Sequence, residues 1–153
     1  MSGFAHAPTE GLIQQALALA GVAEVITVKG LEGGVDLPIS RVAIAAHHRE
    51  GRSERLILKA RDHGLRSADL DLESLALWRE QALAALRCEG PLLEALLWNG
   101  AIQLWRLGLA SDLGAGLAAA ERLLRDGAVE QKRQAIRATL EEGAGREAQS
   151  GLR

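Results

Sequence analysis

A short β-branched run that ends in a glycine-rich loop constrains this chain more than any other stretch. Residues 25–28 read Val-Ile-Thr-Val, a composition that favours a buried strand. The run stops at Lys29, and residues 30–36 read GLEGGVD, with three glycines and two acids. In open α/β sheets, loops of this kind at the carboxyl ends of strands present backbone to ligands. We therefore expect any ligand chemistry of the chain to lie in this loop.

The spacing of apolar residues predicts the order helix, strand, loop, two strands and then four helices. A first helix is expected over 9–20, with Thr9 as its capping residue and Leu12 on its apolar stripe. Strands are expected over 25–28, 41–46 and 55–59. The last two should form an antiparallel hairpin, because the connection between them is short. Helices should follow over about 72–87, 92–107, 112–126 and 128–141, the first capped by Asp71 and the third by Ser111.

This order predicts an α/β fold in which a partial sheet of about three strands packs with a C-terminal group of four helices. The 153 residues fit one domain, which we place at 1–142, with a flexible tail over 143–153. Two or three strands are too few to cover all of these helices. The core is therefore expected to need another half.

Composition narrows the class of protein. The net charge of −2 argues against a dominant nucleic-acid surface, although it allows a local basic patch. Cys88 is the only cysteine, so an intramolecular disulfide is impossible and a cytoplasmic setting is expected. No apolar run is long enough and free enough of charge to span a membrane.

The helix expected over 92–107 is apolar nearly all round and should therefore be central. Trp98 and Trp105 are seven residues apart and share a face, which fits a core or subunit contact better than a ligand stack. In an isolated chain this helix would be partly uncovered. We therefore expect it to meet a missing N-terminal half or to mediate self-association.

One basic cluster stands out between the second and third expected strands. It consists of His47, His48, Arg49, Arg52 and Arg55. These residues could contact the phosphates of a nucleic acid, or they could form an ordinary solvated hairpin turn. A metal site made by the two histidines is disfavoured, because adjacent side chains on a strand point to opposite faces.

Several stretches together resemble a known family. Within a layout that runs from the first helix to about residue 140, they are VKGLEGGVDL at 28–37, DHGL at 62–65, NGA at 99–101, LGLASDL at 107–113 and RDGA at 125–128. Their order resembles the C-terminal part of anthranilate phosphoribosyltransferase and its relatives, the glycosyltransferase family 3 group with a nucleoside phosphorylase-like α/β domain. In the family's loop motif, Lys29 stands in place of His and Glu32 in place of Asp.

The resemblance implies a glycosyltransferase of tryptophan biosynthesis that transfers a phosphoribosyl group from phosphoribosyl pyrophosphate with Mg²⁺. It implies that Lys29, Gly30, Glu32, Gly33 and Gly34 form the substrate and phosphate loop. Asp36 would hold the metal, although Leu37 replaces the family's adjacent Glu. It assigns no catalytic residue. The family's Gly-Thr-Gly-Gly-Asp pyrophosphate loop is absent from the sequence, which suggests an incomplete fragment that is inactive alone.

The loop residues also admit simpler interpretations. Asp36 and Glu32 could be solvent-facing acids that favour turns, and Lys29 could be a solvated lysine at a strand end. The glycines are expected to serve backbone geometry, through positive φ or close approach to a neighbour. Some relatives in a non-catalytic branch of the family bind nucleic acid. A nucleic-acid-binding module that uses the 47–55 cluster is therefore the alternative function.

Overall fold

The computed structural model describes residues 1–150, and it describes only the backbone of Glu32 and of residues 144–150. The predicted α/β class is confirmed. The sheet is open and mixed, with the strand order β1 (Ser2–Gly3), β2 (Glu24–Val28), β3 (Ala43–Arg49) and β4 (Arg52–Leu58). It therefore has four strands where the sequence predicted about three. The additional strand is a two-residue segment that pairs parallel with β2, and two residues are too few to show a periodic pattern.

The β3–β4 hairpin is antiparallel, as predicted, but its strands are longer than expected. Only Glu50 and Gly51 form the turn, and both have positive φ, 52° and 72°, as the tightest hairpin turns require. The prediction that 47–53 is a turn was therefore wrong. His47 and His48 lie in β3, and Arg52 begins β4. These strand residues are polar because their side chains contact polar partners far along the chain. They therefore form no apolar run from which a strand could be predicted.

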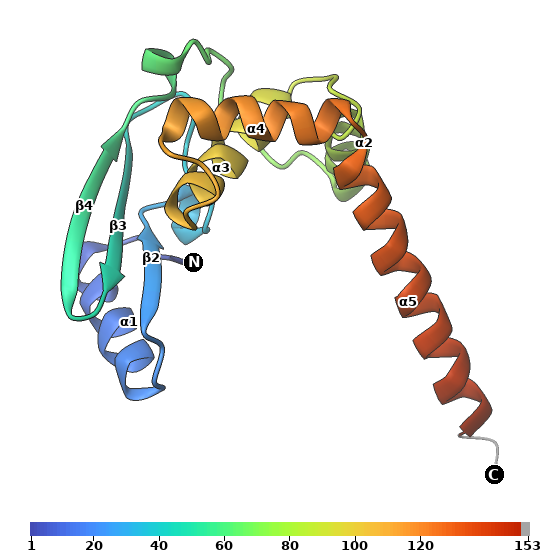
Figure 1. Cartoon of the computed structure of the whole chain (residues 1–153), viewed down its shortest axis with the longest axis horizontal. Helices are drawn as coiled ribbons and strands as arrows, with labels where there is room; N and C mark the ends of the chain where they lie inside the picture. Colours follow the sequence, from blue (N-terminus) through green and yellow to red (C-terminus); the bar gives the residue numbers. More distant parts are fainter. Residues whose placement is uncertain (151–153) are drawn as a thin grey trace.

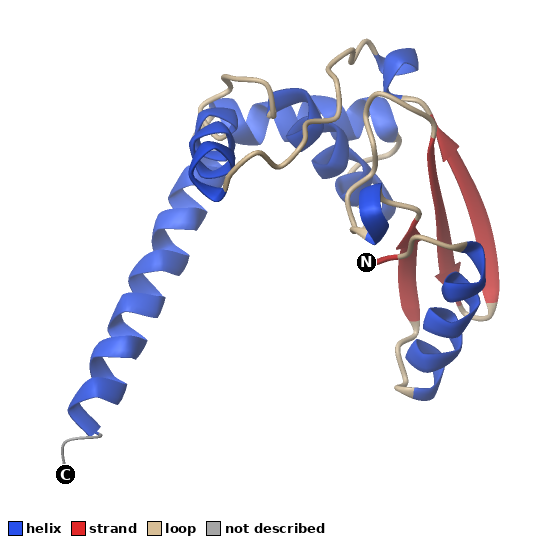
Figure 2. Cartoon of the chain, turned by 180° about the vertical axis from the view of Figure 1, so that it is seen from behind, coloured by secondary structure: helices blue, strands red, loops and turns tan. Residues whose placement is uncertain are grey.

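The strand register sorts the side chains onto two faces of the sheet. Val28, Ala45 and Leu56 are neighbours across the strands, and so are Thr27, Ala46 and Arg55. Because successive side chains alternate between faces, these two rows lie on opposite sides. The first row packs in the main hydrophobic core with residues of α3. The second row faces α1, which lies against the lower part of the sheet (Figures 1 and 2).

Within residues 1–150, five α-helices surround or extend from the sheet, and two short 3₁₀ turns, η1 (Leu31–Gly33) and η2 (Ala60–His63), lie in the connections. The α-helices are α1 (Ala7–Leu19), α2 (Leu75–Ala85), α3 (Leu93–Arg106), α4 (Leu113–Arg125) and α5 (Ala128–Ser150). All three predicted capping residues were wrong. Helix α1 begins at Ala7 with His6 at the N-cap position, so Thr9 lies inside the helix. The Ser74 hydroxyl caps α2 instead of Asp71, and the Asp112 carboxylate caps α4 instead of Ser111. Helix α5 continues to Ser150, beyond the end expected near position 141.

Helix α3 is central, as its sequence predicted. Trp98, Ala101 and Ile102 are fully buried against the sheet, and Trp105 packs on the same core. Helices α3 and α4 lie beside one end of the sheet, and α5 extends away from them as an arm, so that the molecule has the outline of an arch (Figure 1). Within residues 1–150, no helix combines the length and apolar character that crossing a bilayer requires.

Candidate functional site

The glycine-rich loop begins at the carboxyl end of β2, where the sequence placed it. The Lys29 amide still belongs to the sheet, because it donates to the carbonyl of Ile44 at 2.9 Å. The chain then folds tightly on itself. A Cβ atom on Gly30 would lie 1.9 Å from the Gly34 carbonyl oxygen, and Gly33 has φ of +84°. Only glycine fits such positions without strain. The expectation that these glycines serve backbone geometry is thus confirmed.

Distant residues fix the far end of the loop. Leu37 is only 2% exposed, and its amide donates to the Asn99 side-chain oxygen at 2.7 Å. The Asn99 amide nitrogen donates back to the Leu37 carbonyl at 3.2 Å. Two residues further on, the Ile39 amide donates to Asp69 at 2.7 Å. The sequence showed Asn99 only as part of a resembling motif, because a contact across 62 positions leaves no local pattern.

Lys29 and Asp36 are both exposed at the ends of this loop. Neither side chain has an ion pair or hydrogen bond within the described part of the chain, so both are free to meet a ligand. Glu32 was also predicted to serve this loop, but its side chain lies outside what the structure describes. The phosphate-binding and metal-binding roles of these residues stay predictions.

The described residues around Asp36 do not form a complete magnesium site. Leu37 replaces the second acid of the family's pair, and its side chain is turned into the core. Among the residues that the structure describes, no three or more His, Cys, Asp or Glu side chains gather as a metal site. Mg²⁺ prefers six oxygen ligands but usually takes only one or two carboxylates from the protein. Asp36 could therefore contribute one ligand, whereas it could not hold the ion by itself.

The basic cluster at 47–55 is divided between the two faces of the sheet. On the α3 face, His47 contacts Glu24 through Nε2 at 2.6 Å. The other ring nitrogen of His47 meets the Arg106 guanidinium, which also pairs with Glu54 at 2.6 Å. His47 is thus largely buried in a polar network. It does not belong to a solvated turn.

His48 lies on the α1 face in a second polar network. Glu10 is 5% exposed and accepts a hydrogen bond from the Thr27 hydroxyl at 2.7 Å. The Nε2 atom of His48 is 3.0 Å from that hydroxyl and 3.0 Å from the Gln14 amide nitrogen. Arg55 pairs with Glu10 at 3.3 Å. Burial lowers the pKa of His48 below its usual value, and the charges of Arg55 and His47 add to this against the opposing effect of Glu10.

The sequence did not identify Glu10 as a buried residue. The expected apolar stripe of the first helix included Leu12, which is 65% exposed in the structure. The α1 helix instead turns Glu10 and Gln14 toward polar groups of the sheet. Of the basic cluster, Arg49 pairs with the neighbouring Glu50 at 3.7 Å. Within the cluster, only Arg52 has no side-chain partner in the described part of the chain. The predicted nucleic-acid contact would therefore depend mainly on Arg49 and Arg52.

Comparison with known proteins places this geometry in context. No family model matches the chain. The anthranilate phosphoribosyltransferase of Xylella fastidiosa (strain 9a5c) is 29% identical over 121 residues. That alignment covers 76% of this chain, which spans only 35% of the relative's length. The crystal structure of anthranilate phosphoribosyltransferase (TrpD) from Thermus thermophilus aligns with a TM-score of 0.56 at 24% identity, covering 82% of this chain and 38% of that one.

The fold and the loop therefore define an α/β protein of the kind that presents a glycine-rich loop at the carboxyl edge of its sheet. More particularly, the chain is similar to a part of anthranilate phosphoribosyltransferase, and the resemblance read from the sequence is confirmed.

Proposed function

We propose that this chain supplies part of a site for phosphoribosyl transfer from phosphoribosyl pyrophosphate. The observation that carries the proposal is the tight loop after β2, which leaves Lys29 and Asp36 free in solvent. The partial likeness to anthranilate phosphoribosyltransferase supports the choice of this substrate.

Each loop residue has a distinct part in this proposal. Lys29 attracts the phosphate oxygens as a point charge. The glycines let the substrate approach the backbone closely. Asp36 offers an oxygen ligand to Mg²⁺ that is already held by the substrate's phosphates, and the ion would neutralise charge on the departing pyrophosphate. Catalysis in such a site consists mainly of positioning and charge neutralisation.

We also propose that the chain does not catalyse the transfer alone. Its sequence contains no Gly-Thr-Gly-Gly-Asp stretch to hold the pyrophosphate, and the described acids do not complete a metal site. A second protein segment would have to provide the missing ligands. The chain would then bind the substrate weakly and release no pyrophosphate until that segment is added.

Calorimetric titration with phosphoribosyl pyrophosphate tests this role. Wild-type protein should bind the substrate more tightly in Mg²⁺ than in EDTA. The Asp36→Asn variant should lose most of the magnesium dependence, whereas Lys29→Ala should weaken binding under both conditions. Asp71→Asn is the matched control, because Asp71 is an exposed loop aspartate outside the site. Equal binding by wild type and Asp36→Asn in Mg²⁺ would remove the metal role.

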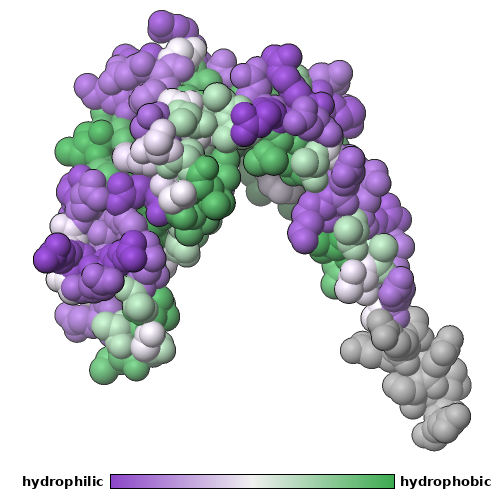
Figure 3. Space-filling view, in the orientation of Figure 1, coloured by the Kyte–Doolittle hydropathy of each residue, from purple (hydrophilic) through white to green (hydrophobic). Residues whose placement is uncertain are grey.

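An apolar groove between α3 and α4 is the proposed contact for a second polypeptide. It has a volume of about 240 Å³ and is lined by residues such as Leu104, Leu107 and Leu123. Hydrophobic surface is visible around α3 on the inner side of the arch (Figure 3). Since exposed apolar patches mark interaction sites, we propose that isolated chains self-associate through this groove. In the complete protein, the missing segment would occupy it.

Light scattering coupled to size-exclusion chromatography tests the groove. Leu107 lines it and is 67% exposed, whereas Leu109 is 70% exposed and lies outside it. The Leu107→Glu variant should therefore be more monomeric than wild type, and Leu109→Glu should behave like wild type. A wild-type chain that stays monomeric at all concentrations would contradict self-association.

A further inference from the structure

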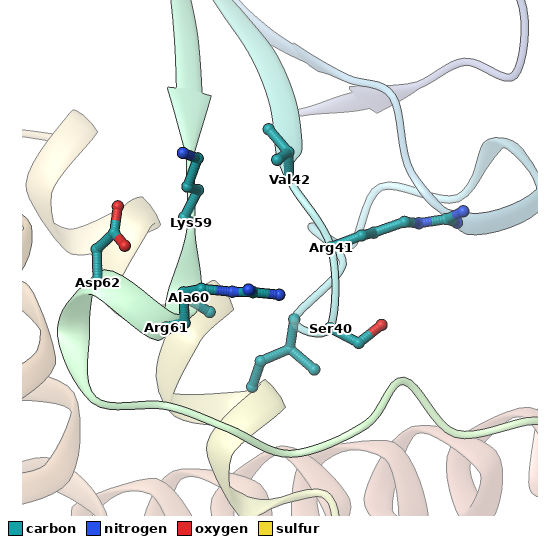
Figure 4. Close-up of a pocket in the computed structure, with 8 residues that line it drawn as sticks. Ser40, Arg41, Val42, Lys59, Ala60, Arg61 and Asp62 are labelled. Atoms are coloured by element: carbon teal, nitrogen blue, oxygen red, sulfur yellow. The ribbon is translucent and has the colours of Figure 1, made fainter.

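We propose that a pocket beside the β3–β4 hairpin binds a phosphate group. The pocket has a volume of about 450 Å³. Segment 39–42, which leads into β3, forms one wall, and segment 59–62, which leaves β4 and forms η2, forms the other (Figure 4). Segment 39–42 belongs to the same connection between β2 and β3 as the glycine-rich residues 30–36, but neither Lys29 nor Asp36 lines the pocket. The inference therefore uses other side chains than the phosphoribosyl-transfer proposal does.

Three cationic side chains line this pocket, and none is neutralised by a described neighbour. They are Arg41 on one wall and Lys59 and Arg61 on the other. All three are exposed, and none has an ion pair or side-chain hydrogen bond in the described part of the chain. Arg61 extends from η2 across the hollow toward Ser40, whereas the Arg41 side chain points away from η2 and lies at the outer rim (Figure 4). Such a concentration of unpaired positive charge is notable in a chain whose net charge is −2.

Two acids lie near the pocket, and neither forms an ion pair with these cations in the described part of the chain. Asp62 also lines it, but its side chain lies on the side of η2 away from Ser40 (Figure 4). The carboxylate of Asp69 is occupied by the amides of Ile39 and Ser40 and by the Ser40 hydroxyl. That carboxylate therefore holds one wall in place, and it makes no direct contact with the three cations.

The base of the pocket is preformed and apolar. Ile39 is 4% exposed and Ala60 is 1% exposed, and both belong to the main core. Long cationic side chains at the rim of a fixed hollow suit an anion with several acceptor oxygens. A phosphate group fits better than a single carboxylate, because it offers more charge and more acceptors to arginine and lysine donors. The ligand could be a free phosphoanion or the backbone of a nucleic acid, which share this chemistry.

Two probes distinguish these sources. Inorganic pyrophosphate is titrated by calorimetry in EDTA, and a short oligothymidylate is titrated by fluorescence anisotropy, both at low salt. The test variants are Arg61→Gln and Lys59→Gln. Arg79→Gln is the charge-matched control, because Arg79 is exposed on α2 and has no side-chain partner in the described part of the chain. Lys29→Ala reports on the loop after β2, and circular dichroism verifies that each variant is folded.

Arg61→Gln should weaken binding of at least one probe by about five- to tenfold, the loss expected for one solvent-exposed hydrogen bond. Arg79→Gln should leave that binding unchanged, and Arg61→Gln should still weaken it when Lys29 is also replaced by alanine. Sensitivity with pyrophosphate alone identifies a free phosphoanion as the ligand, and sensitivity with the oligonucleotide alone identifies a nucleic-acid backbone. The proposal is overturned if wild type binds neither probe, if Arg79→Gln costs as much as Arg61→Gln, or if only Lys29→Ala reduces binding.

Discussion

The close approach of α3 and α4 gives a quantitative test of the packing that supports the site. A Cβ atom placed on Gly116 would lie 2.4 Å from the carbonyl oxygen of Ala101 and 3.2 Å from its Cα. These are backbone atoms of α3, so rotating a side chain cannot relieve the clash. Gly116→Ala should therefore push the two helices apart, and overpacking of this kind costs about 1–3 kcal/mol.

Gly100 provides the matched control on the facing helix. A Cβ atom there would lie 3.7 Å from the Cβ of Ala120, which is ordinary van der Waals contact. Replacing glycine with alanine inside a helix favours the folded state by about 0.5–1 kcal/mol. That gain applies to both variants and cancels in the comparison. Gly100→Ala should therefore be more stable than wild type, and Gly116→Ala should be about 1–3 kcal/mol less stable than Gly100→Ala.

Urea unfolding followed by far-ultraviolet circular dichroism measures the difference. The slopes of the free energy of unfolding against urea must agree between the variants, so that the midpoints report stability alone. At this chain length each 1 kcal/mol should shift the melting temperature by roughly 2–4 °C. If Gly116→Ala proved as stable as Gly100→Ala within about 0.5 kcal/mol, the reasoning from the α3–α4 contact would be refuted.

Two further perturbations test the core and the buried histidine. Trp98 is fully buried, and its Nε1 atom has no hydrogen-bond partner within the described residues. In a urea titration, Trp98→Phe should therefore lower the free energy of unfolding only slightly, whereas Trp98→Ala should lower it by about 3–5 kcal/mol. Equal losses of stability in the two variants would contradict this. Because the folded pKa of His48 is lowered, the unfolded chain binds its proton more readily, and stability is lost as the pH falls below the ordinary value of 6.5. The His48→Gln variant should show a smaller loss between neutral and mildly acidic pH, and an unchanged pH dependence would exclude His48 as its cause.

Local patterns in the sequence were sufficient for the elements that bury a regular apolar face. The strand at 25–28 and the central helix at 92–107 were predicted because their apolar residues are contiguous or periodic. The failures concern residues whose partners are distant. His47, His48 and Arg52 were predicted to lie in a turn because they are polar, yet the two histidines contact groups on β2, α1 and α3.

In the candidate site, too, features with a local cause could be predicted and features that depend on distant contacts could not. The glycines of the loop could be predicted, since their spacing after a strand has a local cause in backbone geometry. The contacts that fix the loop could not, since Asn99 and Asp69 reach it from positions far along the chain. The pocket formed by 39–42 and 59–62 was also missed. Its cations are scattered in the sequence, and only the hairpin pairing brings the two segments together.

The way the loop is anchored has a consequence for binding. Val28 before the loop is fully buried, and Leu37 after it is 2% exposed. Asn99 holds Leu37 through both its amide and its carbonyl, and the neighbouring Trp98 is fully buried in the core. Both ends of the loop are thus part of the folded core and are ordered before any ligand arrives. Since ordering a loop on binding reduces affinity, this arrangement leaves only the exposed side chains of Lys29 and Asp36 to be immobilised. If the loop binds a ligand as proposed, the core would contribute to ligand affinity without contacting the ligand.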